Sequence, residues 1–334
     1  MKRLAVSALL LALLVGCGAP REQSSSCTVF AMDTVMTLTA YGQPEAAEAA
    51  LRSAEAEIRR LDHLLSVTDP GSEIAMLNQA KTATVSKETA SLLESALEVS
   101  RTTEGAYDMT LGRITEAWGF RSGELHVPDA SEISRLISGC GYEHVQVKGT
   151  QVELGANMAV DLGGIAKGYT AERVIAVLQE SGINHAVVSL GGNVGTMGQK
   201  PEGGPWRVAV ENPDHSGEYR PVLLLSGGLY AVTSGAYERY FEEDGVVYHH
   251  ILDPKTGYPA ESDLKSVTVV SPDGTMADGL STALFVMGFD RASAFWRRHS
   301  DEFQMVLITE DGVYATPDLT LDSGRDVAIL EEAP

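Results

Sequence analysis

The sequence predicts an α+β protein in which helices pack over a mostly antiparallel sheet. Amphipathic helical patterns dominate the first half of the chain, and short apolar strands bounded by turn residues dominate the second half. No repeat or long linker interrupts the 334 residues, of which 44% are hydrophobic, as is typical of a globular protein with a large core. We therefore expect one folded unit.

The N-terminus is predicted to be a secretory signal rather than part of this unit. Residues 1–16 hold two basic residues and then an apolar run, 4–15, which is too short for an ordinary membrane span. The run ends in Leu-Val-Gly-Cys, which resembles the bacterial lipobox, so Cys17 is predicted to carry lipid; a plain signal peptide is the alternative. We expect residues 17–27 to be the lipidated cysteine and a polar tether. Residues 28–334 would then form a domain anchored to the cell membrane on its extracytoplasmic side.

The charge balance limits the possible partners. Lys and Arg total 25 against 46 acidic residues, which gives a formal net charge of -21. Such acidity argues against nucleic acid as a partner. It also repels phosphate groups, so an anionic ligand would need local help from a metal ion, a lysine or helix N-termini.

Two cysteines remain after Cys17, namely Cys27 and Cys140. They could pair in an oxidising compartment, but Cys27 lies at the edge of the tether, so we expect no disulfide. With so few cysteines and no HExxH motif, a zinc site is not expected.

The first half of the domain is assigned from residue periodicity and capping residues. Alternating apolar and polar residues predict a strand at 28–41, and apolar residues recur every three or four positions through 44–65. Ser72 and Ser86 stand where helix N-caps are expected. The predicted elements are strand 28–41, helix 44–65, a short helix from Ser72 to about Asn78, helices 86–103 and 131–139, and strands 144–148 and 151–154.

The second half is read mainly as strands. Residues 186–190 form an apolar run that leads into a glycine turn at 191–195, and an Asp-Gly pair at 311–312 predicts a closing hairpin. One apolar helix with polar groups at its start is predicted at 277–287. The predicted strands are 186–190, 206–211, 221–225, 228–232, 246–254, 266–271, 305–309 and 313–316.

The stretch from Asp161 to Tyr169, Asp-Leu-Gly-Gly-Ile-Ala-Lys-Gly-Tyr, is the first candidate site. An apolar run at 158–160 and a helical pattern at 170–180 flank it, which predicts a strand, a glycine turn and a helix. Free N–H groups at the helix start, Lys167 and Asp161 would suit a diphosphate with a divalent cation. An ordinary turn with an exposed lysine is the alternative.

Two further groups could carry chemistry. Asp278 and Thr282 are four residues apart on a predicted helix, so a carboxylate and a hydroxyl could reach one hard cation such as Mg²⁺. A capping Asp and a Thr bonded to its own helix would give the same spacing. His250, in the pair at 249–250, could act as a general base, although a histidine before a turn is more often a surface residue.

Together these motifs resemble the ApbE family of FAD:protein FMN transferases, in the right order from about Phe30 to about Gly288. The matching segments, besides the lipobox, are Met32-Asp-Thr, Ser72-Glu-Ile with Asn78, Gly105-Ala-Tyr-Asp, Trp118-Gly-Phe, the stretch from Asp161, Ser189-Leu-Gly-Gly-Asn, Thr233-Ser-Gly-Ala-Tyr-Glu-Arg, His250-Ile-Leu-Asp-Pro-Lys-Thr-Gly and Ala277-Asp-Gly-Leu-Ser-Thr-Ala.

The resemblance implies a fold related to the T-fold and a defined reaction. It implies that FAD is the substrate, that its FMN part moves to a Thr hydroxyl of an acceptor protein, that AMP leaves and that Mg²⁺ is required. The implied acceptor is a flavoprotein subunit of a membrane electron-transport complex, and many family members are lipoproteins.

The resemblance also implies roles for individual residues. It implies a cation held by the Gly164 carbonyl and the side chains of Asp278 and Thr282, with Ser281 as a further ligand. It implies that His250 takes the proton of the acceptor hydroxyl and that Asp278 is essential for catalysis. The implied FAD contacts are Met32, Ala106, Tyr107, Asp108, Asp161, Lys167 and Leu252.

Three positions depart from the family pattern, which puts contact details in doubt. Asp33 replaces a frequent Gly, Tyr107 a usual Phe, and Thr68 a frequent aromatic residue.

Other functions remain open on the sequence alone. Water could replace the acceptor hydroxyl, which would make the protein a Mg²⁺-dependent FAD pyrophosphatase. A lipoprotein that binds FAD without catalysis and a generic solute-binding lipoprotein are the further alternatives. Self-flavinylation is not expected, because Tyr237 stands where the segment from Thr233 would need a modified hydroxyl residue. The acceptor protein and the oligomeric state are not predicted.

Overall fold

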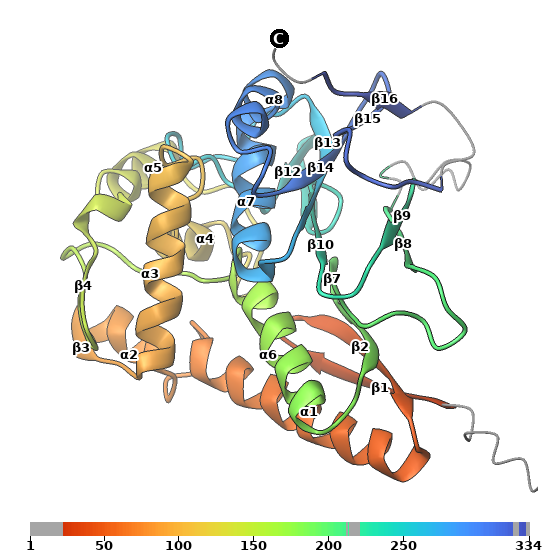
Figure 1. The fold of residues 1–334 in the computed structure, drawn as a ribbon. Coiled ribbons are helices and arrows are strands. Elements are labelled where there is room, and N and C mark those ends of the chain that lie inside the picture. Colours follow the sequence, from red (N-terminus) through yellow and green to blue (C-terminus); the bar gives the residue numbers. More distant parts are fainter. Residues whose placement is uncertain (1–22, 212, 214–220, 323–326, 332–334) are drawn as a thin grey trace, which may run out of the picture.

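A nine-stranded sheet forms the centre of the computed structural model, which describes residues 23–211, 213, 221–322 and 327–331 (Figure 1). Neighbouring strands are antiparallel except for the last pair, which is parallel. In spatial order the strands are β1 (Gln23–Ala31), β2 (Thr34–Gly42), β6 (His185–Leu190), β7 (Asn193–Met197), β10 (Tyr230–Gly235), β13 (Leu264–Ser271), β14 (Gln304–Thr309), β15 (Val313–Ala315) and β16 (Val327–Ile329). The predicted α+β class is confirmed.

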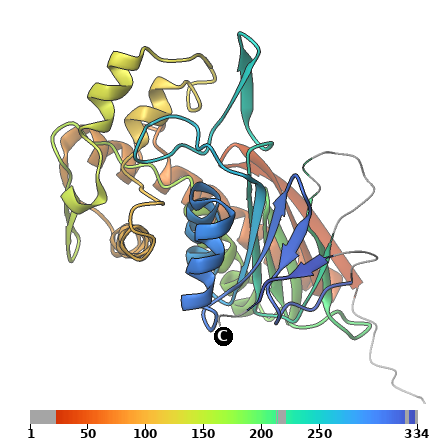
Figure 2. The same ribbon diagram turned by 90° about the horizontal axis from the view of Figure 1, so that it is seen from above.

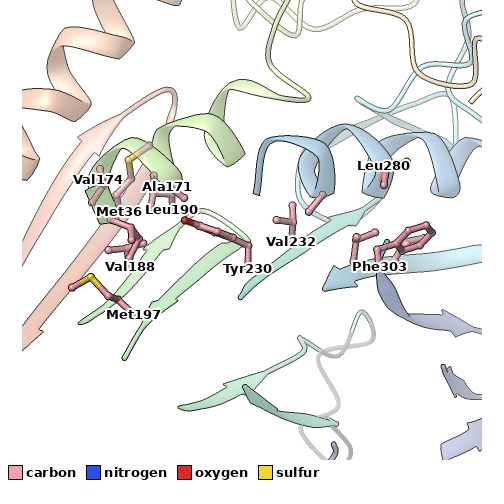
Figure 3. Close-up of a cluster of buried hydrophobic side chains, with 14 of the residues drawn as sticks. Met36, Ala171, Val174, Val188, Leu190, Met197, Tyr230, Val232, Leu280 and Phe303 are labelled. Atoms are coloured by element: carbon pink, nitrogen blue, oxygen red, sulfur yellow. The ribbon is translucent and has the colours of Figure 1, made fainter. Parts of the chain in front are cut away.

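Four helices cover one face of this sheet, as Figure 2 shows from above. They are α1 (Pro44–Leu65), α6 (Ala166–Glu180), α7 (Gly274–Met287) and α8 (Phe289–Arg298). Figure 3 shows the core between the two layers, where residues such as Val174 and Leu280 of the helices meet Val188 and Val232 of the strands. The alternating burial along β6 places every second side chain in this core.

A second layer packs on the side of α1, α6 and α7 that faces away from the sheet (Figure 2). Leu61, Leu93 and Ala283 are fully buried in this second core. The layer contains α2 (Glu73–Ala80), α3 (Lys87–Thr102), α4 (Gly112–Ala117), α5 (Ala130–Ile137), the 3-10 turn η1 (Tyr142–His144) and a small sheet of β3 (Thr82–Thr84), β5 (Gln151–Glu153) and β4 (Gln146–Lys148).

Two hairpins complete the fold. Strands β8 (Trp206–Ala209) and β9 (Val222–Leu225) cover the other face of the main sheet. Strands β11 (Tyr240–Glu243) and β12 (Val246–His249) project from the body in Figure 2 and are held by an aromatic cluster around Trp118. The Trp118 ring is fully buried, and its N–H donates to the Gly257 carbonyl at 2.9 Å.

Most predicted helices lie where the periodicity places them, with Ser72 and Ser86 as N-caps of α2 and α3. The predicted first strand, 28–41, is wrong in one respect. It is a hairpin, because Met32 and Asp33 both take the left-handed conformation that a two-residue turn requires. Its first strand begins at Gln23, so residues 23–26 pair with β2 and are not a free tether.

Other assignments also differ from the structure. The run at 158–160 forms a single bridge at Ala159, because the side chain of Asn78 and the N–H of Gly112 satisfy its backbone instead of a neighbouring strand. The predicted glycine turn 191–195 is only Gly191-Gly192, with both φ angles positive, and β7 follows at once. Strand β10 extends to Gly235, beyond the predicted end at 232. The strand predicted at 246–254 ends at His249. The elements α4, α8, β3, β11 and β16 are not predicted at all.

The predicted signal sequence and Cys17 lie outside the described residues. Among the described helices, none combines the length and the apolar character needed to cross a bilayer. Cys27 and Cys140 are free cysteines, as expected.

Helices α6 and α7 approach closely at Gly168. A Cβ atom there would lie 2.1 Å from the Gly274 carbonyl oxygen and 2.7 Å from the Cβ of Asp278. We expect Gly168→Ala to lower the free energy of unfolding by about 1–3 kcal/mol, because two helix backbones must separate to admit the methyl group. Urea denaturation measures this loss. Gly312→Ala is the control, since no atom lies within 4 Å of its Cβ position, and an equal loss in both variants would contradict the explanation.

Candidate functional site

A cleft of about 630 Å³ opens between the main sheet and the second layer, a volume typical of a small-molecule site. Its walls come from the β1–β2 turn, the C-terminus of α1, the loop before α4, the N-terminus of α6, the end of β10, and α7. Of the residues predicted for the site, the cleft is lined by Met32, Ala106, Tyr107, Asp108, Asp161, Gly164, Lys167, His250, Leu252, Asp278 and Thr282.

Ser281 is the one predicted site residue that does not line the cleft. It is fully buried, and its hydroxyl donates to the Asp278 carbonyl oxygen at 2.8 Å. Its hydroxyl also lies 2.8 Å from that of Ser234, a residue of β10 that sequence reasoning missed. Ser234 in turn lies 3.4 Å from the Thr282 hydroxyl, so Ser281 and Ser234 form a hydroxyl network beside Thr282.

The β1–β2 turn is held in place at one edge of the cleft. Met32 and Asp33 have φ angles of 48° and 59°, a region that non-glycine residues rarely adopt. The Met32 N–H donates to the Asp62 carboxylate at 3.0 Å, and the Asp33 carboxylate lies 3.5 Å from the Arg239 guanidinium.

The loop before α4 contributes Tyr107 and Asp108. Both Asp108 carboxylate oxygens accept backbone hydrogen bonds, from Thr110 at 2.8 Å and from Tyr142 at 3.0 Å, so this side chain shapes the loop. Tyr107 is 4% exposed, and its hydroxyl has no hydrogen-bond partner among the described residues. Burial and the nearby Asp278 and Asp161 carboxylates raise the pKa of the Tyr107 phenol well above its usual value.

The glycines of the stretch from Asp161 serve close packing rather than left-handed geometry. Gly163 and Gly164 are not among the residues with positive φ. A Cβ atom at Gly163 would lie 2.6 Å from an Arg121 guanidinium nitrogen. One at Gly164 would lie 3.1 Å from the Tyr107 ring. These two glycines therefore provide room for neighbouring side chains and not a left-handed turn.

The prediction of a row of free N–H groups also needs correction, because the protein itself uses most of them. The N–H groups of Ile165 and Ala166 donate to the Leu162 carbonyl, and that of Gly163 donates to Asp161. Lys167 belongs to the stretch itself, and its ammonium lies 3.4 Å from the Gly163 carbonyl oxygen.

One backbone carbonyl is left without a donor as a result of a helix–helix contact. The Gly168 N–H donates to Asp278 Oδ2 at 2.7 Å, instead of to the Gly164 carbonyl four residues earlier. No described residue donates to that carbonyl. A Cβ atom at Gly164 would lie 3.4 Å from Thr282 Oγ1, and Asp278 is 2% exposed.

We call Gly164, Asp278 and Thr282 the cation site. A carbonyl, a carboxylate and a hydroxyl are hard oxygen donors with a single negative charge, which suits Mg²⁺ bound together with substrate phosphates. The described part of the chain holds no cluster of three or more His, Cys, Asp or Glu residues arranged for a metal. A cation here would therefore depend on the backbone, on Thr282 and on its substrate.

An ion pair that sequence reasoning missed braces the start of this stretch. Arg121 Nε donates to Asp161 Oδ2 at 2.7 Å, and a second guanidinium nitrogen contacts Oδ1. Burial alone would raise the pKa of the Asp161 carboxyl, but the Arg121 guanidinium outweighs it and lowers that pKa below its usual value. Both carboxylate oxygens of Asp161 are thus occupied by hydrogen bonds from Arg121 and from the Gly163 N–H. The only sequence signal was that Arg121 directly follows the Trp118-Gly-Phe motif.

His250 lies at the cleft as a neutral imidazole. Burial, with the nearby Lys167 ammonium, lowers its pKa to about 3. Its Nδ1 lies 3.2 Å from the Arg239 carbonyl oxygen, which can only accept, so Nδ1 carries the proton and Nε2 keeps a free lone pair.

This depressed pKa makes stability dependent on pH. The unfolded chain binds the His250 proton near pH 6.5, whereas the folded chain binds it only near pH 3. The contribution of His250 to the free energy of unfolding is therefore fully present above pH 6.5. It declines as the pH falls, because the unfolded chain then binds the proton that the folded chain does not. We expect the melting temperature to fall less between pH 7 and pH 4.5 in His250→Gln than in the wild type. The surface variant His126→Gln should follow the wild-type curve, and a parallel curve for His250→Gln would refute the assignment.

Comparison with known proteins gives consistent matches over most of the chain. Residues 32–307 match the ApbE family. A FAD:protein FMN transferase of Vibrio cholerae is 35% identical over 316 residues, which cover 90% of this chain and 92% of that protein. One of Treponema pallidum is 34% identical, covering 84% of this chain and 83% of that protein.

Solved structures agree with these matches. The crystal structure of the ApbE protein from Thermotoga maritima has a TM-score of 0.80 and 33% identity, covering 90% of this chain and 97% of that chain. The apo form of the Pseudomonas stutzeri flavinyl transferase ApbE has a TM-score of 0.78 and 29% identity, covering 90% of this chain and 95% of that chain.

Proposed function

Since the chain belongs to the ApbE family and its relatives are FAD:protein FMN transferases, we propose a specific transfer reaction for it. The protein moves FMN from FAD to a Thr hydroxyl of an acceptor flavoprotein, and Mg²⁺ assists the reaction. The observation that carries the finer part of this proposal is the cation site, which faces the cleft of about 630 Å³ beside the neutral His250. The transferase activity itself follows from the family.

In the proposed reaction the acceptor oxygen attacks the phosphorus of the FMN half of FAD. A new P–O bond forms, the bond to the AMP half breaks, and AMP leaves. The Nε2 atom of His250 takes the proton of the acceptor hydroxyl, since its Nδ1 is engaged with the Arg239 carbonyl. Bound Mg²⁺ would neutralise charge on the diphosphate oxygens, which is the main requirement of phosphoryl transfer.

Substrate binding would strengthen His250 as a base. An imidazole with a pKa of about 3 is a weak base, and the first causes of that value are burial and the nearby Lys167. An anionic diphosphate placed between the two side chains would raise the pKa of His250 and offset the charge of Lys167. The Lys167 ammonium would contribute to holding the diphosphate in a strongly acidic protein.

A labelling experiment tests the proposal. The protein, FAD and Mg²⁺ are incubated with a flavoprotein subunit of a membrane electron-transport complex, and flavin fluorescence is recorded on a denaturing gel. We expect a covalently fluorescent acceptor and release of AMP, both lost when the acceptor Thr is changed to Ala. Release of FMN and AMP without labelling would favour the FAD pyrophosphatase. Stoichiometric FAD without AMP would favour a binding protein.

We also propose that Cys17 carries a lipid that anchors the protein to the outer side of the cell membrane, near such acceptors. The Leu-Val-Gly-Cys sequence supports this. Cys17→Ser should move the protein from the membrane to the soluble fraction and abolish incorporation of labelled palmitate. Membrane retention of that variant would refute the anchor.

A further inference from the structure

The Tyr107 hydroxyl is an unpaired donor inside the catalytic cleft. Tyr107 is 4% exposed, and its hydroxyl oxygen is inaccessible and without a hydrogen-bond partner among the described residues. Buried polar groups are nearly always paired, and leaving one unpaired is costly. The wild-type side chain therefore carries a cost that a phenylalanine would not carry.

The Tyr107 ring lies against the cation site. A Cβ atom built on Gly164 would lie 3.1 Å from Tyr107 Cε2 and 3.4 Å from Thr282 Oγ1. The Tyr107 ring and the Thr282 hydroxyl therefore both lie over Gly164. The Tyr107 hydroxyl is attached to the ring carbon next to Cε2. Asp278 is the charged group with the strongest electrostatic effect on it.

The neighbouring carboxylates do not use this donor. Both Asp108 oxygens accept from backbone N–H groups, and both Asp161 oxygens face Arg121. Asp278 Oδ2 accepts from the Gly168 N–H, which leaves Oδ1 for a cation. An acceptor for the Tyr107 hydroxyl must therefore arrive with a ligand.

We propose that the Tyr107 hydroxyl donates a hydrogen bond to an oxygen atom in the coordination shell of the cation, which is either a bound water or a phosphate oxygen of FAD. This role rests on the proposed function and adds a ligand-orienting donor to the cation site. An oxygen bound to Mg²⁺ is a suitable acceptor, because a donor from outside the first shell fixes its orientation and tunes cation binding.

Tyr107→Phe is expected to have two effects of opposite sign. Without ligands, the variant should melt at the wild-type temperature or above it, because no hydrogen bond is lost and an unpaired hydroxyl is removed. Its Kd for Mg²⁺, measured by calorimetric titration, should rise about tenfold. Titration with Mg²⁺ alone and with Mg²⁺ plus FAD separates the two oxygen sources, since a water gives the effect in both and a phosphate oxygen only in the second.

Tyr169→Phe is the matched control, because its hydroxyl is paired with Glu88 at 2.8 Å and does not line the cleft. It should lower the melting temperature and leave Mg²⁺ binding unchanged. A Tyr107→Phe protein that melts lower than the wild type, or binds Mg²⁺ equally well in both titrations, would overturn the inference. Acceptor labelling by the wild-type protein is measured in the same preparation. If the wild type labels its acceptor, the proposed function stands even where the Tyr107 inference fails. If the wild type neither binds Mg²⁺ nor labels the acceptor, the proposed function is refuted.

Discussion

Asp278→Ala is expected to lower kcat/KM for FMN transfer by about 1,000-fold or more, which corresponds to roughly 4 kcal/mol of lost transition-state stabilisation. Asp278 supplies the single carboxylate of the cation site, and its side chain is 2% exposed. The loss should persist at high Mg²⁺ concentration. Acceptor labelling over a series of Mg²⁺ concentrations measures it, and full activity in Mg²⁺ would refute the cation site.

Two variants separate this effect from damage to the fold. Asp278→Asn keeps an oxygen that can accept from the Gly168 N–H, so it should retain more stability than the alanine variant and still lack activity. Asp273→Asn removes a carboxylate at the N-cap of the same helix, outside the cleft, and Asn caps helices as well as Asp does. It should keep wild-type activity.

Arg121→Leu is expected to lower the free energy of unfolding at pH 7 by about 3 kcal/mol, because it leaves the Asp161 carboxylate buried and without its cation. It should also raise the KM for FAD more than tenfold, since Arg121 and Asp161 both line the cleft. Urea denaturation and steady-state kinetics measure the two effects.

The pH dependence of this destabilisation gives a second test. In the wild type the Asp161 pKa is depressed, so the carboxylate stabilises the fold at neutral pH and loses this effect only in strong acid. Without Arg121, burial would raise that pKa. Protonation of Asp161 would then remove the unpaired charge and reduce the destabilisation of the variant as the pH falls. The stability difference should therefore be smaller at pH 4 than at pH 7. Arg207→Leu breaks an exposed pair with Asp322 and should cost less than about 1 kcal/mol; an equal loss would contradict the role of burial.

The sequence predicted the fold well where one segment determines its own structure. Helix α1 carries its apolar stripe within 22 residues, and Ser72 and Ser86 cap their helices through local bonds. Elements that depend on distant partners were missed. Strand β11 is mostly exposed and exists through pairing with β12, and the run at 158–160 makes a single bridge because distant residues take its backbone groups.

The site was predicted in a similar way. Long motifs contain most of the residues that line the cleft, because each motif keeps its residues together in the chain. They did not show how the residues interact. The Arg121–Asp161 pair joins residues 40 positions apart, and the contact between Gly168 and Asp278 spans 110. Such pairs form only when the layers pack, which is why the bond from the Gly168 N–H to Asp278 was not predicted.

With the proposed lipid on Cys17, the early start of β1 would limit how far the cleft can stand from the bilayer. The six residue-to-residue steps from Cys17 to Gln23 extend over about 20 Å at most. The nine residues of β1 add about 30 Å before the Met32 turn reaches the cleft. With a lipid on Cys17, an acceptor threonine must come within about 50 Å of the membrane surface to be flavinylated. Lengthening the segment before Gln23 with a Gly/Ser insertion would extend this range to taller acceptors.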